Sequence, residues 1–216
     1  MKEVNSYGWK AVIGSSIGYA MDGFDLLILG FMLTLISGDL GLTTGQAGSL
    51  VTWTLVGAVI GGFIFGTLSD KFGRVRVLTW TIVLFAVFTG LCAFAQGYWD
   101  LLVYRTIAGI GLGGEFGIGM ALAAEAWPAQ HRAKATSYVA IGWQLGVLAA
   151  ALLTPVLLPY IGWRGMFMVG IIPAFVAWIF RAKLHEPEIF VQSKDTKEHS
   201  HTNSFKLLVK DVRTTK

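Results

Sequence analysis

The sequence has few of the charged residues that a water-soluble domain needs. Only 14% of its 216 residues are charged, whereas soluble domains carry about 25%. Hydrophobic residues make up 54% of the chain, and the mean hydropathy is +0.61. This number of charged residues cannot cover a water-facing surface. The composition therefore excludes an ordinary soluble domain. It is typical of helices that lie in lipid.

Cysteine is almost absent. The one cysteine, Cys92, lies in an apolar run, so an intramolecular disulfide framework is excluded. The sequence also lacks metal-ligand spacing and lacks a nucleophile beside a base at a membrane face. We therefore expect no enzyme and no metal or organic cofactor.

Basic residues exceed acidic ones, 17 against 13, for a formal net charge of +4. Basic proteins often bind nucleic acid, but such proteins gather their basic residues in a patch or stripe. Here the basic residues are spread along the polar connections and have no interleaved aromatic residues. We expect no nucleic-acid partner.

Six apolar segments divide the chain, and most have the roughly 20 residues that a membrane-spanning helix needs. They are residues 11–36, 47–68, 75–95, 99–123, 136–158 and 166–180. The first is too long for a cleavable signal peptide and carries two aspartates, so we expect it to be retained. The predicted fold is an all-α integral membrane protein with six transmembrane helices.

Lysine and arginine predict the orientation, because they gather on the cytoplasmic side of a membrane. With the amino terminus inside, the outer connections keep only Arg164. The inner faces then hold Lys2, Lys10, Lys71, Arg74, Arg76, Arg132, Lys134 and every basic residue from Arg181 onward. We predict a cell-membrane protein with a cytoplasmic amino terminus (residues 1–10), a bundle (11–180) and a cytoplasmic linker (181–216).

Asp22 and Asp25 lie near the middle of the first apolar segment. Because they are three residues apart, they share one face of a helix. An ionised carboxylate at this depth needs water, a proton or a cation. The pair therefore predicts ion coupling, substrate contact or a gate. The alternative is that one aspartate only satisfies a neighbouring backbone or an internal arginine.

The fourth apolar segment carries Arg105 and Glu115, with glycines between them at positions 109, 111, 113 and 114. Glycines at helical spacing let two helices pack closely in lipid. Arg105 either pairs with Asp25, Asp22 or a carbonyl, or it anchors an anionic substrate, since a guanidinium matches a carboxylate. Glu115 is a further candidate proton carrier. Glu125, near Arg132, is expected to form a surface ion pair.

The connection between the second and third segments carries a specific motif. Gly66 suits a close helix approach, Gly73 suits a tight turn, and Asp70 can pair with Arg74 or cap a helix end. Its residues are Gly66, Asp70, Lys71, Gly73, Arg74 and Arg76, with Val75 where a basic residue is usual. The motif resembles the signature loop of the major facilitator superfamily.

Further stretches narrow the resemblance. The first segment carries Asp-Gly-Phe-Asp, and later stretches read Gly-Gly-Glu-Phe-Gly, Glu-Ala-Trp-Pro and Gly-Trp-Arg-Gly-Met-Phe. Together they are similar to metabolite:proton symporters, especially sialate and aromatic-acid transporters. The resemblance covers only the amino-terminal half of a twelve-helix protein, so we expect a fragment or a truncated frame. It implies that Asp70 contacts a second six-helix half, and that the loop latches the two halves together.

A three-plus-three inverted repeat is expected within the half. The turn Phe72-Gly73-Arg74 has a faint counterpart in Gly162-Trp163-Arg164.

The resulting hypothesis is proton-coupled symport of a small organic acid by alternating access. A proton would neutralise Asp22 or Asp25 as the substrate carboxylate meets Arg105. The expected partners are lipid, the organic anion, and either the missing half or a second copy. The alternatives are a sugar or drug transporter, a homodimer of six-helix chains, and an inactive remnant.

Overall fold

The computed structural model describes residues 6–182, and within them helices are joined by short connections and no strand occurs. The elements are α1 (Ser6–Leu40), α2 (Thr44–Phe72), α3 (Arg74–Cys92), α4 (Tyr98–Glu125), the short 3-10 helix η1 (Ala129–His131) and α5 (Arg132–Ala182). Five of these helices are long and apolar enough to cross a membrane. The predicted all-α membrane class is therefore confirmed. Residues 1–5 and nearly all of the predicted linker (181–216) lie outside the described residues.

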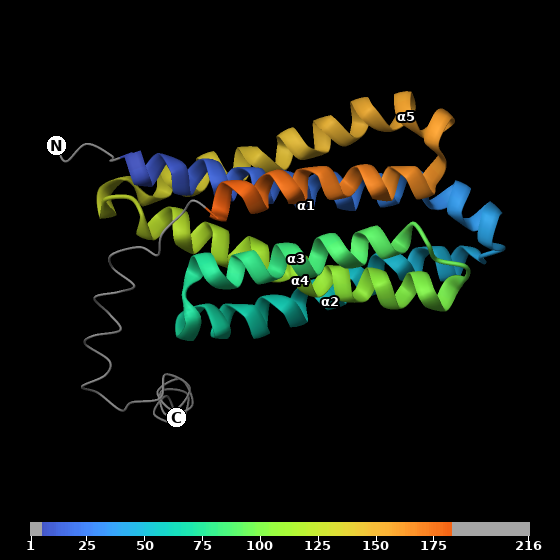
Figure 1. Ribbon diagram of the computed structural model, residues 1–216, viewed down its shortest axis with the longest axis horizontal. Coiled ribbons are helices and arrows are strands. Elements are labelled where there is room, and N and C mark those ends of the chain that lie inside the picture. The colour runs from blue at the N-terminus through green and yellow to red at the C-terminus, as the bar shows by residue number, and fades with distance from the viewer. Residues whose placement is uncertain (1–5, 183–216) are drawn as a thin grey trace, which may run out of the picture.

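Where the sequence predicts six helices, five long helices are assigned, because α5 covers the last two apolar segments. Its backbone leaves the helical conformation at Gly162, with φ 64° and ψ 179°. Glycine adopts a positive φ without the strain of a Cβ. Figure 1 shows that α5 reverses here, so that its two arms run in opposite directions. The connection predicted at 159–165 is thus a bend at a single glycine.

The bundle is elongated, and its helices turn at two opposite ends (Figure 1). One end holds the α2–α3 turn at Gly73 and the α4–η1 connection, and the other holds the bend of α5 at Gly162. We call them the inner and outer ends, after the orientation predicted from the basic residues. Arg74 lies at the inner end and Arg164 at the outer end.

Helices α2 and α4 meet backbone to backbone. A Cβ added to Gly113 would lie 1.7 Å from the Ala58 carbonyl oxygen, and one added to Gly61 would lie 1.9 Å from the Ile110 carbonyl oxygen. No side chain fits in such a gap, so only glycine allows this approach. We call this contact the glycine seam. The close packing predicted from the glycines of the fourth segment is confirmed.

Local sequence explains two of the helix ends. Thr43 caps the start of α2 with a capping box. Its hydroxyl accepts a hydrogen bond from the backbone N–H of Gln46, and the Gln46 side-chain oxygen accepts one from the backbone N–H of Thr43. Gly73 ends α2 and begins α3 with φ 106°, as the predicted tight turn requires.

Candidate functional site

The centre of the bundle holds a buried ion pair between α1 and α4. Arg105 donates from Nη1 to Asp25 Oδ1 over 3.0 Å and from Nη2 to Oδ2 over 2.7 Å. The side chains are 0% and 1% exposed. Two parallel bonds to one carboxylate are the strong geometry for arginine. Of the partners that the sequence left open for Arg105, Asp25 is the one that the structure provides.

Two further residues also contact Arg105. Its Nε donates to the Thr54 hydroxyl of α2 over 3.4 Å, and its guanidinium carbon lies 5.8 Å from the centroid of the Phe167 ring of α5. Sequence reasoning missed both residues. One signal was available for Phe167: it lies one helical turn after Trp163, so both belong to one face of the segment that follows the Gly162 bend.

Asp22 lies about one turn before Asp25 on α1 and is also buried. It lines a cavity of about 730 Å³ between α1, α2, α4 and α5. Three aromatic side chains line this cavity, and the Tyr19 ring contacts the other two: its centroid lies 5.1 Å from that of Phe116 and 5.1 Å from that of Trp143. The two aspartates therefore have different surroundings, one bound to arginine and one beside a cavity.

Arg105 and Glu115 are not among the described residues that line this cavity. Glu115 is 2% exposed and accepts a hydrogen bond from the Thr81 hydroxyl of α3 over 3.3 Å. It therefore faces the α3–α4 contact. The predicted proton and substrate residues fall into three places: the Asp25–Arg105 pair, the cavity beside Asp22, and Glu115 against α3.

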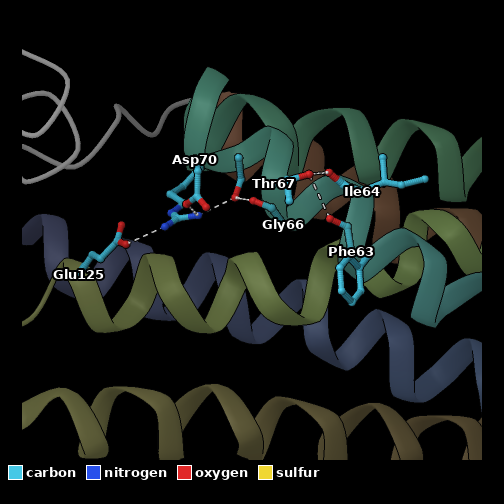
Figure 2. Close-up of polar contacts among 8 residues, drawn as sticks. Phe63, Ile64, Gly66, Thr67, Asp70 and Glu125 are labelled. Carbon is cyan, nitrogen blue, oxygen red and sulfur yellow. Dashed lines mark hydrogen bonds and ion pairs between the residues drawn. The ribbon is translucent and has the colours of Figure 1, made fainter. Parts of the chain in front are cut away.

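The signature motif forms a charged cluster at the inner end, which we call the inner cluster. Arg74 bonds Asp70 of α2 over 2.7 Å and Glu125 of α4 over 3.2 Å, and it also donates to the Ser69 hydroxyl. Figure 2 shows Asp70 on α2 and Glu125 on α4, and Thr67 bonded to the carbonyls of Phe63 and Ile64. The predicted Asp70–Arg74 pair is present.

The other two basic residues of the motif are exposed at the surface. The Lys71 ammonium lies 5.4 Å from the Phe72 ring centroid, and Arg76 is exposed on α3. No described helix approaches closely at Gly66, because a Cβ there would meet nothing within 4 Å. Gly66 instead lines the cavity. Glu125 does form an ion pair, but with Arg74 and not with its sequence neighbour Arg132.

A second charged cluster, which we call the outer cluster, forms where α5 bends. Arg164 donates to the Asp39 carboxylate at the end of α1 and to the Ala95 carbonyl over 3.2 Å. Its guanidinium carbon lies 4.1 Å from the Trp163 ring centroid. The Trp163 indole donates to the same Asp39 oxygen over 3.0 Å. The outer ends of α1 and α5 and the α3–α4 turn are thus held together.

Comparison with known proteins identifies relatives along almost the whole chain. A Haemophilus influenzae protein named for metabolite transport is 75% identical, over 99% of this chain and 54% of that protein. The cis,cis-muconate transport protein of Acinetobacter baylyi is 34% identical over 97% and 52%. The sialic acid transporter NanX of Escherichia coli is 33% identical over 89% and 48%. The chain spans about half the length of these relatives.

The fold agrees with the sequence comparison. The xylose transporter XylE of Escherichia coli, in a partially occluded inward open conformation, superposes with a TM-score of 0.79 over 90% of this chain and 52% of that one. At 24% identity this match shows the fold alone. The family model of the Major Facilitator Superfamily matches residues 15–215. The chain therefore belongs to the Major Facilitator Superfamily, a family of transporters and not of enzymes.

Proposed function

We propose that this chain forms one half of a proton-coupled symporter that carries a small organic acid across the cell membrane by alternating access. The observation that carries the proposal is the fully buried Asp25–Arg105 pair. Intramembrane charges of this kind mark ion and substrate routes. The names of the relatives add the substrate class, since muconate and sialic acid are both carboxylic acids.

The pair supplies a coupling mechanism. While Asp25 is ionised, its charge neutralises that of Arg105 and both groups are satisfied without water. Protonation of Asp25 removes the ionic partner and leaves a buried guanidinium, which is strongly unfavourable. A substrate carboxylate that reaches Arg105 would restore the pairing. Proton binding and anion binding would then favour each other, which is the requirement for symport.

Asp22 offers a second proton site, at the cavity wall. Among the described residues that line this cavity, the ionisable acids are Asp22, Asp70 and the phenol Tyr19, and none is basic. An anion would be repelled by an ionised Asp22 and could accept a hydrogen bond from a protonated one. Glu115 remains a third candidate, farther from the cavity.

The architecture of the whole transporter is also part of the proposal. Counting the two arms of α5 separately gives six spans, in two groups of three: α1 to α3, and α4 with the arms of α5. The amino terminus would be cytoplasmic, and a second half or a second copy would supply the other wall of the cavity. Asp70 suits a contact with that partner, because 61% of its side chain stays exposed while it bonds Arg74.

The test is proton-driven uptake of sialate, muconate and benzoate by membrane vesicles that contain the natural gene product. Asp25→Asn should abolish accumulation driven by a proton gradient, because the amide cannot bind and release a proton. Asp22→Asn should at least weaken it. Asp100→Asn is the matched control, since Asp100 is an exposed aspartate in the first turn of α4. If both α1 variants still accumulate substrate as the control does, the proposed coupling is wrong.

A further inference from the structure

Phe167 joins the outer cluster to the buried ion pair. The residue is 0% exposed, and its ring lies 6.0 Å from the Trp163 ring in an edge-on contact of 89°. Its own ring lies 5.8 Å from the Arg105 guanidinium carbon. Both aromatic residues belong to the second arm of α5, coloured orange to red in Figure 1.

The contacts form an unbroken row across the outer half of the bundle. Asp39 bonds the Trp163 indole, Trp163 packs on Phe167, and Phe167 lies against Arg105, which bonds Asp25. The row begins at a half-exposed carboxylate and ends at a fully buried one. The bend at Gly162 places its aromatic members, because they lie one and five residues after it.

We propose that Phe167 is a positioning residue for Arg105, which holds the guanidinium in place when Asp25 takes up its proton. The inference deepens the proposed function and rests on it. An aromatic ring attracts a cation through its negative face, and the attraction is larger in a site without water. At Arg105 the described surroundings are dry, since the side chain is 0% exposed.

The ring matters most in the protonated state. Among the described residues, the ionisable groups that face Arg105 are Asp25 of α1 and the Cys92 thiol of α3. The Thr54 hydroxyl of α2 adds a bond of 3.4 Å. While Asp25 is ionised, two charge-assisted hydrogen bonds hold the guanidinium whether or not the ring is present. Once Asp25 is neutral, the ring and Thr54 carry a larger share. The ring therefore favours proton binding, and weakening it should make proton binding require a lower pH.

Fluorinated phenylalanines at position 167 test this directly. Successive fluorine atoms reduce the negative charge on the ring face while the shape of the side chain hardly changes, so folding should be preserved. We expect the pH of half-maximal uptake to fall stepwise with fluorine number, by up to about one pH unit for the trifluoro ring. Phe167→Leu should show the full shift, and Phe167→Tyr should keep most of the natural profile.

Phe175 is the matched control. It lies on the same arm of α5, and the residue is 58% exposed. The same fluorinated series at Phe175 should leave the pH profile unchanged. A flat series at Phe167, or an equal shift at both positions, would overturn the inference.

A second readout does not require transport. The melting temperature of the purified protein in detergent should fall more for Phe167→Leu than for Phe175→Leu, and the difference should be greater at low pH than at high pH. A merely structural Phe167 would give a difference that does not change with pH, and that result would overturn the inference. If uptake is absent, or Asp25→Asn remains proton-driven, the proposed function fails, and the melting series still decides the role of Phe167.

Discussion

Two regions of this molecule repeat one chemical arrangement under opposite conditions. In the middle of the bundle, Arg105 bonds Asp25 of α1 and lies against the Phe167 ring. At the outer end, Arg164 bonds Asp39, which is also on α1, and lies against the Trp163 ring. The central side chains are 0% and 1% exposed, and the outer ones 45% and 47%.

The difference shows that burial decides what an ion pair can do. Water replaces a lost partner at the outer end, and salt screens what remains, so this pair contributes modestly and breaks without a large penalty. At the centre no water replaces the partner, so a single proton changes the balance of forces. The outer pair is suited to bracing helix ends, and the central pair is suited to switching. The inner cluster is intermediate in exposure, since the Arg74 side chain is 17% exposed.

The largest effect is expected at the centre. Asp25→Ala leaves Arg105 buried without a carboxylate, which should destabilise the protein by about 3–5 kcal/mol. Adding Arg105→Leu should recover much of this loss, because an apolar pair suits a dry site, while uptake stays abolished. Chemical or thermal unfolding in detergent measures both effects. A double variant as unstable as Asp25→Ala would mean that the pair acts on stability through something other than its charge.

An intermediate effect is expected at the inner cluster. Arg74→Gln removes the cation that joins α2, α3 and α4, and should cost about 1 kcal/mol of stability because the cluster is partly hydrated. Lys134→Gln removes an exposed charge that is also on the predicted inner face, and should have no measurable effect. Equal losses for the two variants would show that net charge matters here and the specific bonds do not.

The smallest effect is expected at the outer cluster. Arg164→Gln should lower the melting temperature slightly at low ionic strength, and the difference from the natural protein should shrink in high salt, since exposed charges are screened. Asp25→Ala should keep its deficit in the same salt series. If salt erases both deficits, or neither, the contrast between the buried and exposed pairs is wrong.

Much of this arrangement could be predicted from the sequence, because it depends on order along the chain. The charges at Asp22, Asp25 and Arg105 stand out against apolar neighbours, and the Asp70–Arg74 pair follows from helical spacing across a glycine turn. Contacts between helices could not be predicted in this way. Spacing along one segment does not say which helix faces it, and both Thr54 and Phe167 were therefore missed.

The same limit explains where the described structure differs from the expectations. Glu125 was paired with Arg132 because they are close in sequence, whereas the fold brings Arg74 beside it. Gly66 was expected at a helix contact because glycine often permits one, but here it borders the cavity. The α2–α4 glycines did meet backbone, since several of them recur at helical spacing on one helix. Repetition of a pattern predicted a contact better than a single residue did.

The glycine seam has a consequence for the proton gradient that would drive transport. A gap closed by side chains can open for an instant when a side chain changes rotamer, within picoseconds to nanoseconds. Between α2 and α4 the gap is closed by backbone, with the Ala58 oxygen directly against Gly113, and backbone has no rotamers to change. Parting these helices requires motion of whole elements, which takes microseconds to milliseconds. We therefore expect the seam to limit proton leakage between these two helices, which lie beside the cavity that Asp22 lines.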